Sequence, residues 1–432
     1  MVYWAPLLHF YQPPLQLPRV LRKVCDESYR PLIEVFRQYP NAKVTVNICG
    51  VLTEMLWEGG YQDVVNGLRE LAARGQIEFT GSAKYHPILP LIPNEEIERQ
   101  IRRNFLTNRR YFGEEYAPKG FFPPEMAYGP SILEPVIESR HQWILLSGVA
   151  CPATWPVRQV YQAGSNDETL AVFFRDDILS NRISFHNIDD DGFLAHLRRL
   201  RDGQKDAYVI TAMDAETFGH HVQNWEKLFL AEVYEALGTG NGSHRELQQS
   251  QPLATQHEKL FAYSQPADVD IEAVTISELL ERFPRGPEIE PLASSWSTSK
   301  EDIAAGNIYP LWKDPHNVVH WLQWHHLNLC IELVHQAEKC AEGRASRRFA
   351  DIARHLLDEA EHSCQFWWAS KRPMWDINMI ARGLAQQTQA ILNAYKALKL
   401  GRCDEAVRSE FYYKVVGMRD LAAKIYDRLY ED

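Results

Sequence analysis

An apolar run ends in a group of charged and polar side chains in the stretch Asp206-Ala207-Tyr208-Val209-Ile210-Thr211-Ala212-Met213-Asp214-Ala215-Glu216-Thr217-Phe218-Gly219-His220-His221. The apolar part, residues 207–213, is typical of a strand that is buried on both faces. Asp214 and Glu216 stand where this strand ends. A carboxylate there loses solvation energy, so a neighbour or a function has to compensate for it. The alternative is that both acids only cap a following helix, as acids near a helix N-terminus often do.

Length and composition set broad limits on the protein. A chain of 432 residues is too long for one small core, and we expect two or three domains. The net charge of -11 argues against a nucleic acid or an acidic membrane as partner. Seven scattered cysteines without a CxxC pattern favour reduced thiols. No apolar stretch reaches membrane-spanning length, and no signal peptide is evident, so we expect a cytoplasmic protein.

The first two thirds of the chain alternate between strand and helix patterns. Such alternation predicts a parallel sheet with helices outside it. Seven or eight strand candidates occupy about 280 residues, which is the size of a (β/α) barrel. The fallback is a doubly wound sheet, although no glycine-rich phosphate turn follows the first strand. The strand candidates are 2–8, 43–48, 76–80, 120–125, 142–146, 170–174, 207–213 and 272–275.

The character of the chain changes after this region. Residues 286–315 are irregular but carry aromatic side chains, and we expect an inter-domain linker. Residues 316–432 are helix-periodic and free of strand patterns, which predicts a helical bundle. The first domain is thus expected at residues 1–285. Within it, the polar stretch 238–268 has little periodicity, and a loop of that length is usually functional or mobile.

Polar residues recur where the strand candidates end. In a barrel these positions share one face, where catalytic groups gather. Glu125 is flanked by prolines and aromatic residues, so its carboxyl group is expected to be held firmly and partly desolvated. Two carboxylates on one barrel face, with tryptophans to stack on sugars, suit a glycoside hydrolase, which needs no metal or other cofactor. The strand-end residues are His9, Asn47, the loop with His86, Glu125, Asp214 and Glu216.

The whole chain resembles glycoside hydrolase family 57, whose members are α-amylases, amylopullulanases, branching enzymes and 4-α-glucanotransferases. The resemblance rests on five short motifs in the family's order. The first is widened here by two residues between histidine and glutamine. The resemblance implies a seven-stranded (β/α) barrel, distorted relative to a TIM barrel, followed by a helical bundle. The motifs are His9-Phe10-Tyr11-Gln12-Pro13, residues 75–80, 122–128 and 212–219, and Val274-Thr275-Ile276-Ser277-Glu278.

The resemblance also implies a retaining mechanism on α-glucans or oligosaccharides with α-1,4 or α-1,6 linkages. Glu125 is then the nucleophile and Asp214 the general acid/base. We expect a raised pKa for Asp214, because apolar walls and a nearby ionised Glu125 disfavour its anion. The substrate-binding residues predicted with them are His9, Gln12, His86, Glu216, His220, Trp296 and Trp312.

Two other functions remain open from the sequence. His86, Asp214 and His220 could form the metal site of a deacetylase-like barrel enzyme, or the protein could bind carbohydrate without turnover. Many family members have an acid in the helical domain where this chain has Cys364 or Gln365. The sequence leaves the glucan, the choice between hydrolysis and transfer, and the oligomeric state undecided.

Overall fold

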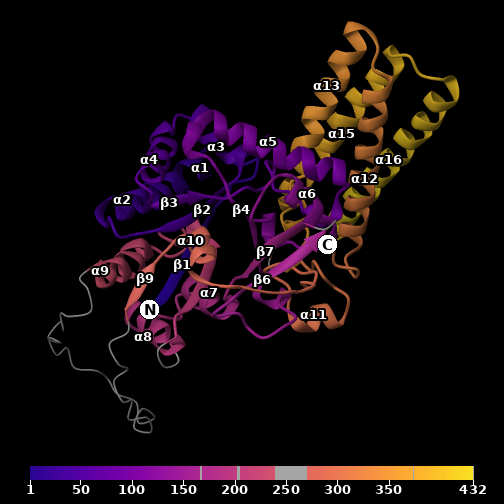
Figure 1. The fold of residues 1–432 in the computed structure, drawn as a ribbon. Coiled ribbons are helices and arrows are strands. Elements are labelled where there is room, and N and C mark those ends of the chain that lie inside the picture. Colours follow the sequence, from indigo (N-terminus) through magenta and orange to yellow (C-terminus); the bar gives the residue numbers. More distant parts are fainter. Residues whose placement is uncertain (166–167, 202–204, 239–269, 373, 432) are drawn as a thin grey trace.

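A computed structural model describes residues 1–165, 168–201, 205–238, 270–372 and 374–431. These residues form an α/β part followed by a helical part, as Figure 1 shows. Apart from Gly238, the predicted loop at 238–268 lies outside the described residues. Among the helices that the structure describes, none is long and apolar enough to cross a membrane.

The strands form two sheets. One has the order β3-β2-β1-β8, with β9 also paired to β1, and the other has the order β10-β6-β7-β5-β4. All these pairs are parallel except β6 with β7. The strands are β1 (Val2–Phe10), β2 (Val44–Ile48), β3 (Ile77–Phe79), β4 (Gly120–Phe121), β5 (Trp143–Leu146), β6 (Val160–Ser165), β7 (Glu168–Phe174), β8 (Ala207–Asp214), β9 (Ile271–Ala273) and β10 (Arg285–Glu288).

Short contacts bring the two sheets together at both sides. A parallel bridge pairs Gly81, just after β3, with Phe121 in β4. The amide of Asp176, just after β7, donates a hydrogen bond of 2.8 Å to the carbonyl of Ile210 in β8. The predicted α/β class is confirmed, while closure into a seven-stranded barrel stays a prediction.

Helices surround the sheets of the α/β part. They are α1 (Pro18–Val24), α2 (Arg30–Gln38), α3 (Gly50–Glu58), α4 (Gln62–Ala73), α5 (Asn94–Phe112), α6 (Leu133–Glu138), α7 (Asp177–Ser184), α8 (Asp190–Leu200), α9 (Glu232–Gly238) and α10 (Ile276–Arg282). Helix α10 begins with a capping box, in which Thr275 and Glu278 are the two members. Helix α11 (Lys300–Ala304) lies in the segment that the sequence suggested as a linker.

The helical part stands at one side of the α/β part, beside α5 (Figure 1). One continuous hydrophobic core joins the two, since Ile97 and Ile144 belong to the same buried cluster as Leu327 and Leu357. Burial of apolar surface therefore packs the helical part against the α/β part. Its helices are α12 (Val318–Cys340), α13 (Gly343–Ala360), α14 (Cys364–Trp367), α15 (Ile377–Leu400) and α16 (Glu405–Glu431).

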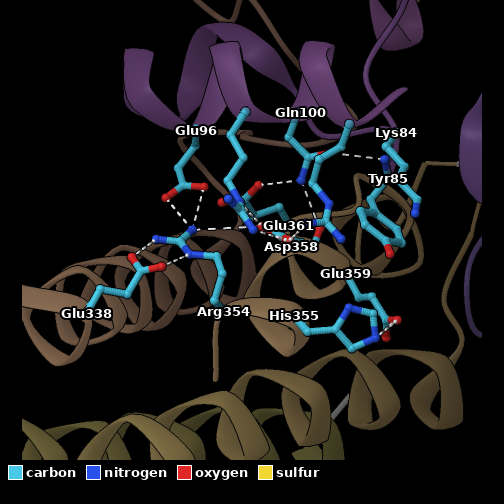
Figure 2. A network of polar contacts seen from close by, with 12 residues as sticks. Lys84, Tyr85, Glu96, Gln100, Glu338, Arg354, His355, Asp358, Glu359 and Glu361 are labelled. Carbon is cyan, nitrogen blue, oxygen red and sulfur yellow. Dashed lines mark hydrogen bonds and ion pairs between the residues drawn. The ribbon is translucent and has the colours of Figure 1, made fainter. Parts of the chain in front are cut away.

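Ion pairs with buried members also join the helical part to the α/β part, as Figure 2 shows. Arg354 in α13 donates to Glu96 in α5 at 2.7 Å, and the side chains are 9% and 1% exposed. Arg99 in α5 donates to Asp358 in α13 at 2.6 Å, and Asp358 is fully buried. Removing one partner of such a pair leaves the other charge buried without compensation.

We expect Arg354→Gln to destabilise the protein by about 3 kcal/mol, because the buried Glu96 carboxylate then loses its cationic arginine partner and keeps only its contact with His335. The midpoint of urea unfolding, followed by fluorescence, measures the change. Arg428→Gln is the matched control, because Arg428 pairs with Glu431 on the surface with side chains 51% and 61% exposed and its loss should cost under about 1 kcal/mol. Equal effects of the two substitutions would contradict the importance of the buried pair.

Candidate active site

The register of the parallel strands determines which polar side chains lie next to one another in the site. His9 in β1 is paired with Asn47 in β2 and with Asp214 in β8. Residues paired across parallel strands point to the same side of the sheet. Three polar side chains from three strands therefore meet at the carboxyl ends of the strands, where the sequence placed them.

Glu125 reaches the site from a turn with unusual backbone geometry. Two prolines precede it, and β4 is only two residues long, because proline has no N–H for a ladder. Glu125 has φ 58° and the site residue His86 has φ 60°. Such left-handed conformations cost an ordinary residue about 1–2 kcal/mol and gather at functional sites.

Trp296 holds Glu125 in this conformation. Its main-chain N–H donates to the Glu125 carbonyl at 3.1 Å, and its indole Nε1–H donates to Glu125 Oε2 at 2.9 Å. Next to these contacts, Tyr128 pairs with Ser294 in an antiparallel bridge. The segment between the two parts of the protein thus forms one wall of the site.

A chain of hydrogen bonds runs across the site to Glu125. His9 Nδ1 lies 2.6 Å from Asn47 Oδ1, and His9 Nε2 lies 3.1 Å from His86 Nε2. His86 Nδ1 lies 2.9 Å from Ser363 Oγ, and this hydroxyl lies 3.4 Å from Glu125 Oε1. His86 Nδ1 itself is 3.6 Å from Glu125 Oε1.

Aromatic rings line the same region. The half-buried ring of Tyr11 stacks on His86 with centroids 3.8 Å apart and an angle of 14°. The ring of Phe122 stacks on His9 at 5.2 Å. Cys364 Sγ contacts the Tyr11 hydroxyl at 3.4 Å.

Glu216 lies deeper than the other two acids. It is 4% exposed and accepts hydrogen bonds from Gln12, at 2.8 Å, and from the Tyr29 hydroxyl. Burial, and then the charge of Asp214, raise its pKa to about 8. This environment makes Glu216 and Gln12 supports behind the site.

Glu125 and Asp214 differ in how they are held. Burial, and then the negative charge of Asp214, raise the pKa of Glu125 to about 8, against the hydrogen bonds from Trp296 and Ser363. Burial raises the pKa of Asp214 to about 6, and the positive charge of Arg175 opposes the shift. The predicted direction for Asp214 agrees with this, and its apolar walls are the cause. Because the charge of Asp214 acts on both Glu125 and Glu216, the three acids do not titrate independently.

Asp214 is the open acid of the site. Within the described residues its carboxyl group makes no hydrogen bond or ion pair, so both oxygens are available to a ligand. Arg175 fixes the strand that carries it, since Arg175 Nε–H donates to the Ala212 carbonyl at 2.7 Å. The Ala212 amide in turn donates to Ser180 Oγ at 3.2 Å.

Two predicted substrate-binding residues are engaged in other contacts. His220 is hydrogen-bonded to Glu27, with 2.6 Å between Nδ1 and Oε2. Trp312 is 1% exposed within the core, so its ring has no free face for a sugar. Across the described ranges, no three His, Cys, Asp or Glu side chains are grouped so as to hold a metal, and this includes His86, Asp214 and His220.

Several site residues were not predicted. Ser363 enters from the helical part, directly before the Cys364 that the sequence had singled out. Gln365 is excluded from the site, because its amide donates to carbonyls inside the bundle. Tyr11 lies within the first motif, and Arg175 directly follows a strand, so each had a signal in the sequence.

Solved structures share this arrangement of an α/β part completed by helices. The branching enzyme of Pyrococcus horikoshii superposes with a TM-score of 0.70 at 17% identity, over 98% of this chain and 95% of that chain. The 4-alpha-glucanotransferase of Thermococcus litoralis superposes with a TM-score of 0.67 at 19% identity, over 93% of this chain and 60% of that chain. The fold is therefore shared with these two enzymes.

The sequence places the chain more narrowly. Residues 8–255, more than half of the chain, match the model of glycosyl hydrolase family 57. The protein belongs to glycosyl hydrolase family 57. It is 24% identical to an alpha-amylase of Pyrococcus horikoshii, over 69% of this chain and 43% of the relative. It is 26% identical to a 4-alpha-glucanotransferase of Thermococcus kodakarensis, over 69% of this chain and 42% of that relative. The matched region spans about two fifths of the length of these relatives.

We expect Glu216→Gln to flatten the dependence of stability on pH. The folded pKa of Glu216 is raised from 4.5 to about 8, so the folded state keeps a proton that the unfolded state releases. Stability from this proton is complete below pH 4.5 and is lost as the pH rises towards 8, with a slope of at most about 1.4 kcal/mol per pH unit. Urea unfolding of both proteins between pH 5 and 8 measures the difference.

The exposed Glu34 provides the control for this series. Glu34→Gln should leave the slope of the wild type unchanged. If the curves of Glu216→Gln and wild type run parallel, Glu216 is ionised in the folded protein and the interpretation is wrong.

Proposed function

We propose that the protein is a retaining α-glycosidase or transglycosylase that acts on α-glucans or oligosaccharides with α-1,4 linkages, α-1,6 linkages or both. One observation carries the proposal. Two carboxyl groups in one buried site have different surroundings: Glu125 is gripped by Trp296, and Asp214 is open. Double displacement needs one fixed nucleophile and one acid that can approach the leaving oxygen.

In this mechanism Glu125 attacks the anomeric carbon as a carboxylate. The Trp296 indole holds Oε2, which leaves Oε1 as the attacking oxygen. Asp214 gives its proton to the departing glycosidic oxygen, and a glycosyl-enzyme ester forms. Asp214 then removes a proton from water or from an acceptor sugar, which attacks the ester and restores Glu125.

The same walls suit a sugar ring. The stacked rings of Tyr11 and His86, with Trp296 on another side, offer aromatic surface beside the acids. His9 belongs to the same group of rings. Trp312 is left out of the proposed binding residues because it is buried. α-Glucan as substrate is supported by relatives named alpha-amylase and 4-alpha-glucanotransferase.

The proposed division of labour uses three segments: 1–285 as the catalytic part, 286–315 as the linker and 316–432 as the helical bundle. The linker supplies Trp296 and the bundle supplies Ser363. Both touch Glu125, so each segment contributes to one site.

We expect a substrate with a good leaving group to distinguish the roles of the two acids. With maltooligosaccharides, Glu125→Gln and Asp214→Asn should each lose on the order of 10³-fold in kcat/KM. With an α-maltosyl fluoride, whose fluoride departs without a proton, Asp214→Asn should recover formation of the glycosyl-enzyme, and Glu125→Gln should not. Fluoride release and mass spectrometry of the ester measure the difference.

The stereochemistry of the product tests retention directly. Proton NMR during turnover of a maltooligosaccharide should show the α-anomer first. A β-anomer as the first product would overturn the double displacement, and full activity of either acid variant would overturn its role. Glu431→Gln, at the exposed carboxyl end of α16, is the control and should behave as wild type.

We expect Arg175→Met to move the alkaline limb of the kcat/KM profile to higher pH. The positive charge of Arg175 opposes the raised pKa of Asp214. Without this charge the pKa of Asp214 rises further. Asp214 then keeps the proton that it gives to the leaving oxygen up to a higher pH. Arg175→Lys retains a charge and should give a smaller shift. Profiles on a maltooligosaccharide measure the limbs, and a limb that moves to lower pH would contradict the electrostatic role.

A further inference from the structure

Two cysteine thiols meet where α12 ends and the chain turns from α15 into α16. The Sγ atoms of Cys340 and Cys403 lie 2.6 Å apart, although 63 residues separate them in the sequence. Both are free thiols. Such a pair can form a disulfide only if the backbone on both sides also holds the two residues close together.

Main-chain contacts meet this condition. Cys340 is the last residue of α12, and its carbonyl accepts a hydrogen bond of 3.0 Å from the amide of Arg402, directly before Cys403. Gly401, which follows α15, makes this approach possible, because a Cβ atom there would collide with the Cys340 carbonyl oxygen. The backbone therefore places the two cysteines side by side without help from a bond between them.

The more accessible thiol of the pair is Cys403. Its side chain is half-buried, whereas Cys340 is 8% exposed. Beside them a cavity of about 300 Å³ lies between α12 and α16. Gln336 lines this cavity and donates its side-chain amide to Cys340 Sγ at 3.3 Å. A small reagent therefore reaches Cys403 first, while Cys340 lies behind it in contact.

We propose that Cys340 and Cys403 are a site of reversible oxidation, at which a small organic disulfide is reduced and a disulfide between the two residues forms. The Cys403 thiolate attacks one sulfur of the reagent, the reagent's S–S bond breaks, and one small thiolate leaves. The Cys340 thiolate then attacks the Cys403 sulfur, and the second small thiolate leaves. Both cysteine protons end on the small thiols, and the pair gives the reagent two electrons.

Cys151 offers a comparison within the same chain. It is also half-buried, but its Sγ atom contacts an oxygen, the Ala153 carbonyl, at 3.5 Å. A cysteine in this position can take up one half of the reagent as a mixed disulfide. Completion of the exchange needs the second thiol that Cys403 has beside it.

The bond closes a loop that includes part of the active site. The segment between the two cysteines contains α13, α14 and α15, and with them Ser363, whose hydroxyl contacts Glu125. A covalent bond across a long loop lowers the entropy of the unfolded chain and so stabilises the folded state. In a reducing compartment, exchange with small thiols reverses the reaction.

The first test maps the bond. Native wild-type protein is incubated with oxidised glutathione at about pH 8.5, because burial raises the pKa of Cys403 to about 11 and only the thiolate attacks. After the remaining thiols are alkylated in denaturant, trypsin should release residues 340–344 and 403–408 joined by a disulfide. Recovery of these two peptides unjoined would overturn the proposal.

Single substitutions separate the two steps. Cys340→Ser should leave one glutathione on Cys403, because the thiol that displaces it is missing. Cys151→Ser keeps the pair and should give the joined peptides in the wild-type amount. Loss of glutathione from Cys340→Ser at the wild-type rate would overturn the two-step exchange.

The second test compares the stability of oxidised and reduced wild-type protein. After the reagent is removed, the oxidised protein should have a urea midpoint on the order of 1 M higher, and dithiothreitol should abolish the difference. The same treatment should leave the midpoint of Cys403→Ser unchanged. Equal midpoints for the two wild-type forms, or a lower one after oxidation, would overturn the stabilising effect of the bond. Neither test uses a glucan, so both outcomes are independent of the proposed function.

Discussion

The site depends first on the parallel register of β1 with β2 and β8. That register brings His9, Asn47 and Asp214 to one level and one side of the sheet. Because side chains alternate along a strand, a slip of one residue would turn all polar members of a strand to the opposite face. Apolar residues before these positions pack the core and fix the register. The same force that folds the sheet therefore buries the polar groups at its end.

The three buried acids, Glu125, Asp214 and Glu216, differ in the contacts that compensate for their burial. All three carboxyl groups have raised pKa values with burial as the first cause. Glu216 receives two donors and lies in the interior, so it supports the structure around it. Glu125 receives an indole donor that fixes one oxygen. Asp214 has only the charge of Arg175 to offset its burial, and it stays open. A fixed acid beside an open acid is the asymmetry that double displacement requires.

The sequence predicted what strand patterns carry and missed what tertiary contacts decide. Alternation of strands and helices predicted the parallel sheet, and polarity at strand ends indicated Asp214 and Glu125. The burial of Trp312 could not be seen, because it results from packing in a core shared with the helical part. Ser363 had no local signal for its partner either, since 238 residues separate it from Glu125. The choice between Cys364 and Gln365 likewise needed the direction in which each side chain points.

The Cys364 thiol affects the balance of charge in the site. The Cys364 thiol lies beside Tyr11 and faces Glu125, and burial raises its pKa to about 12. It is therefore neutral wherever the enzyme operates near pH 7. A carboxylate at this position would add a second negative charge next to the one on Asp214, and both would oppose ionisation of Glu125. The neutral thiol adds no such charge, so ionisation of Glu125, the proposed nucleophile, is favoured by the hydrogen bonds that Trp296 and Ser363 donate.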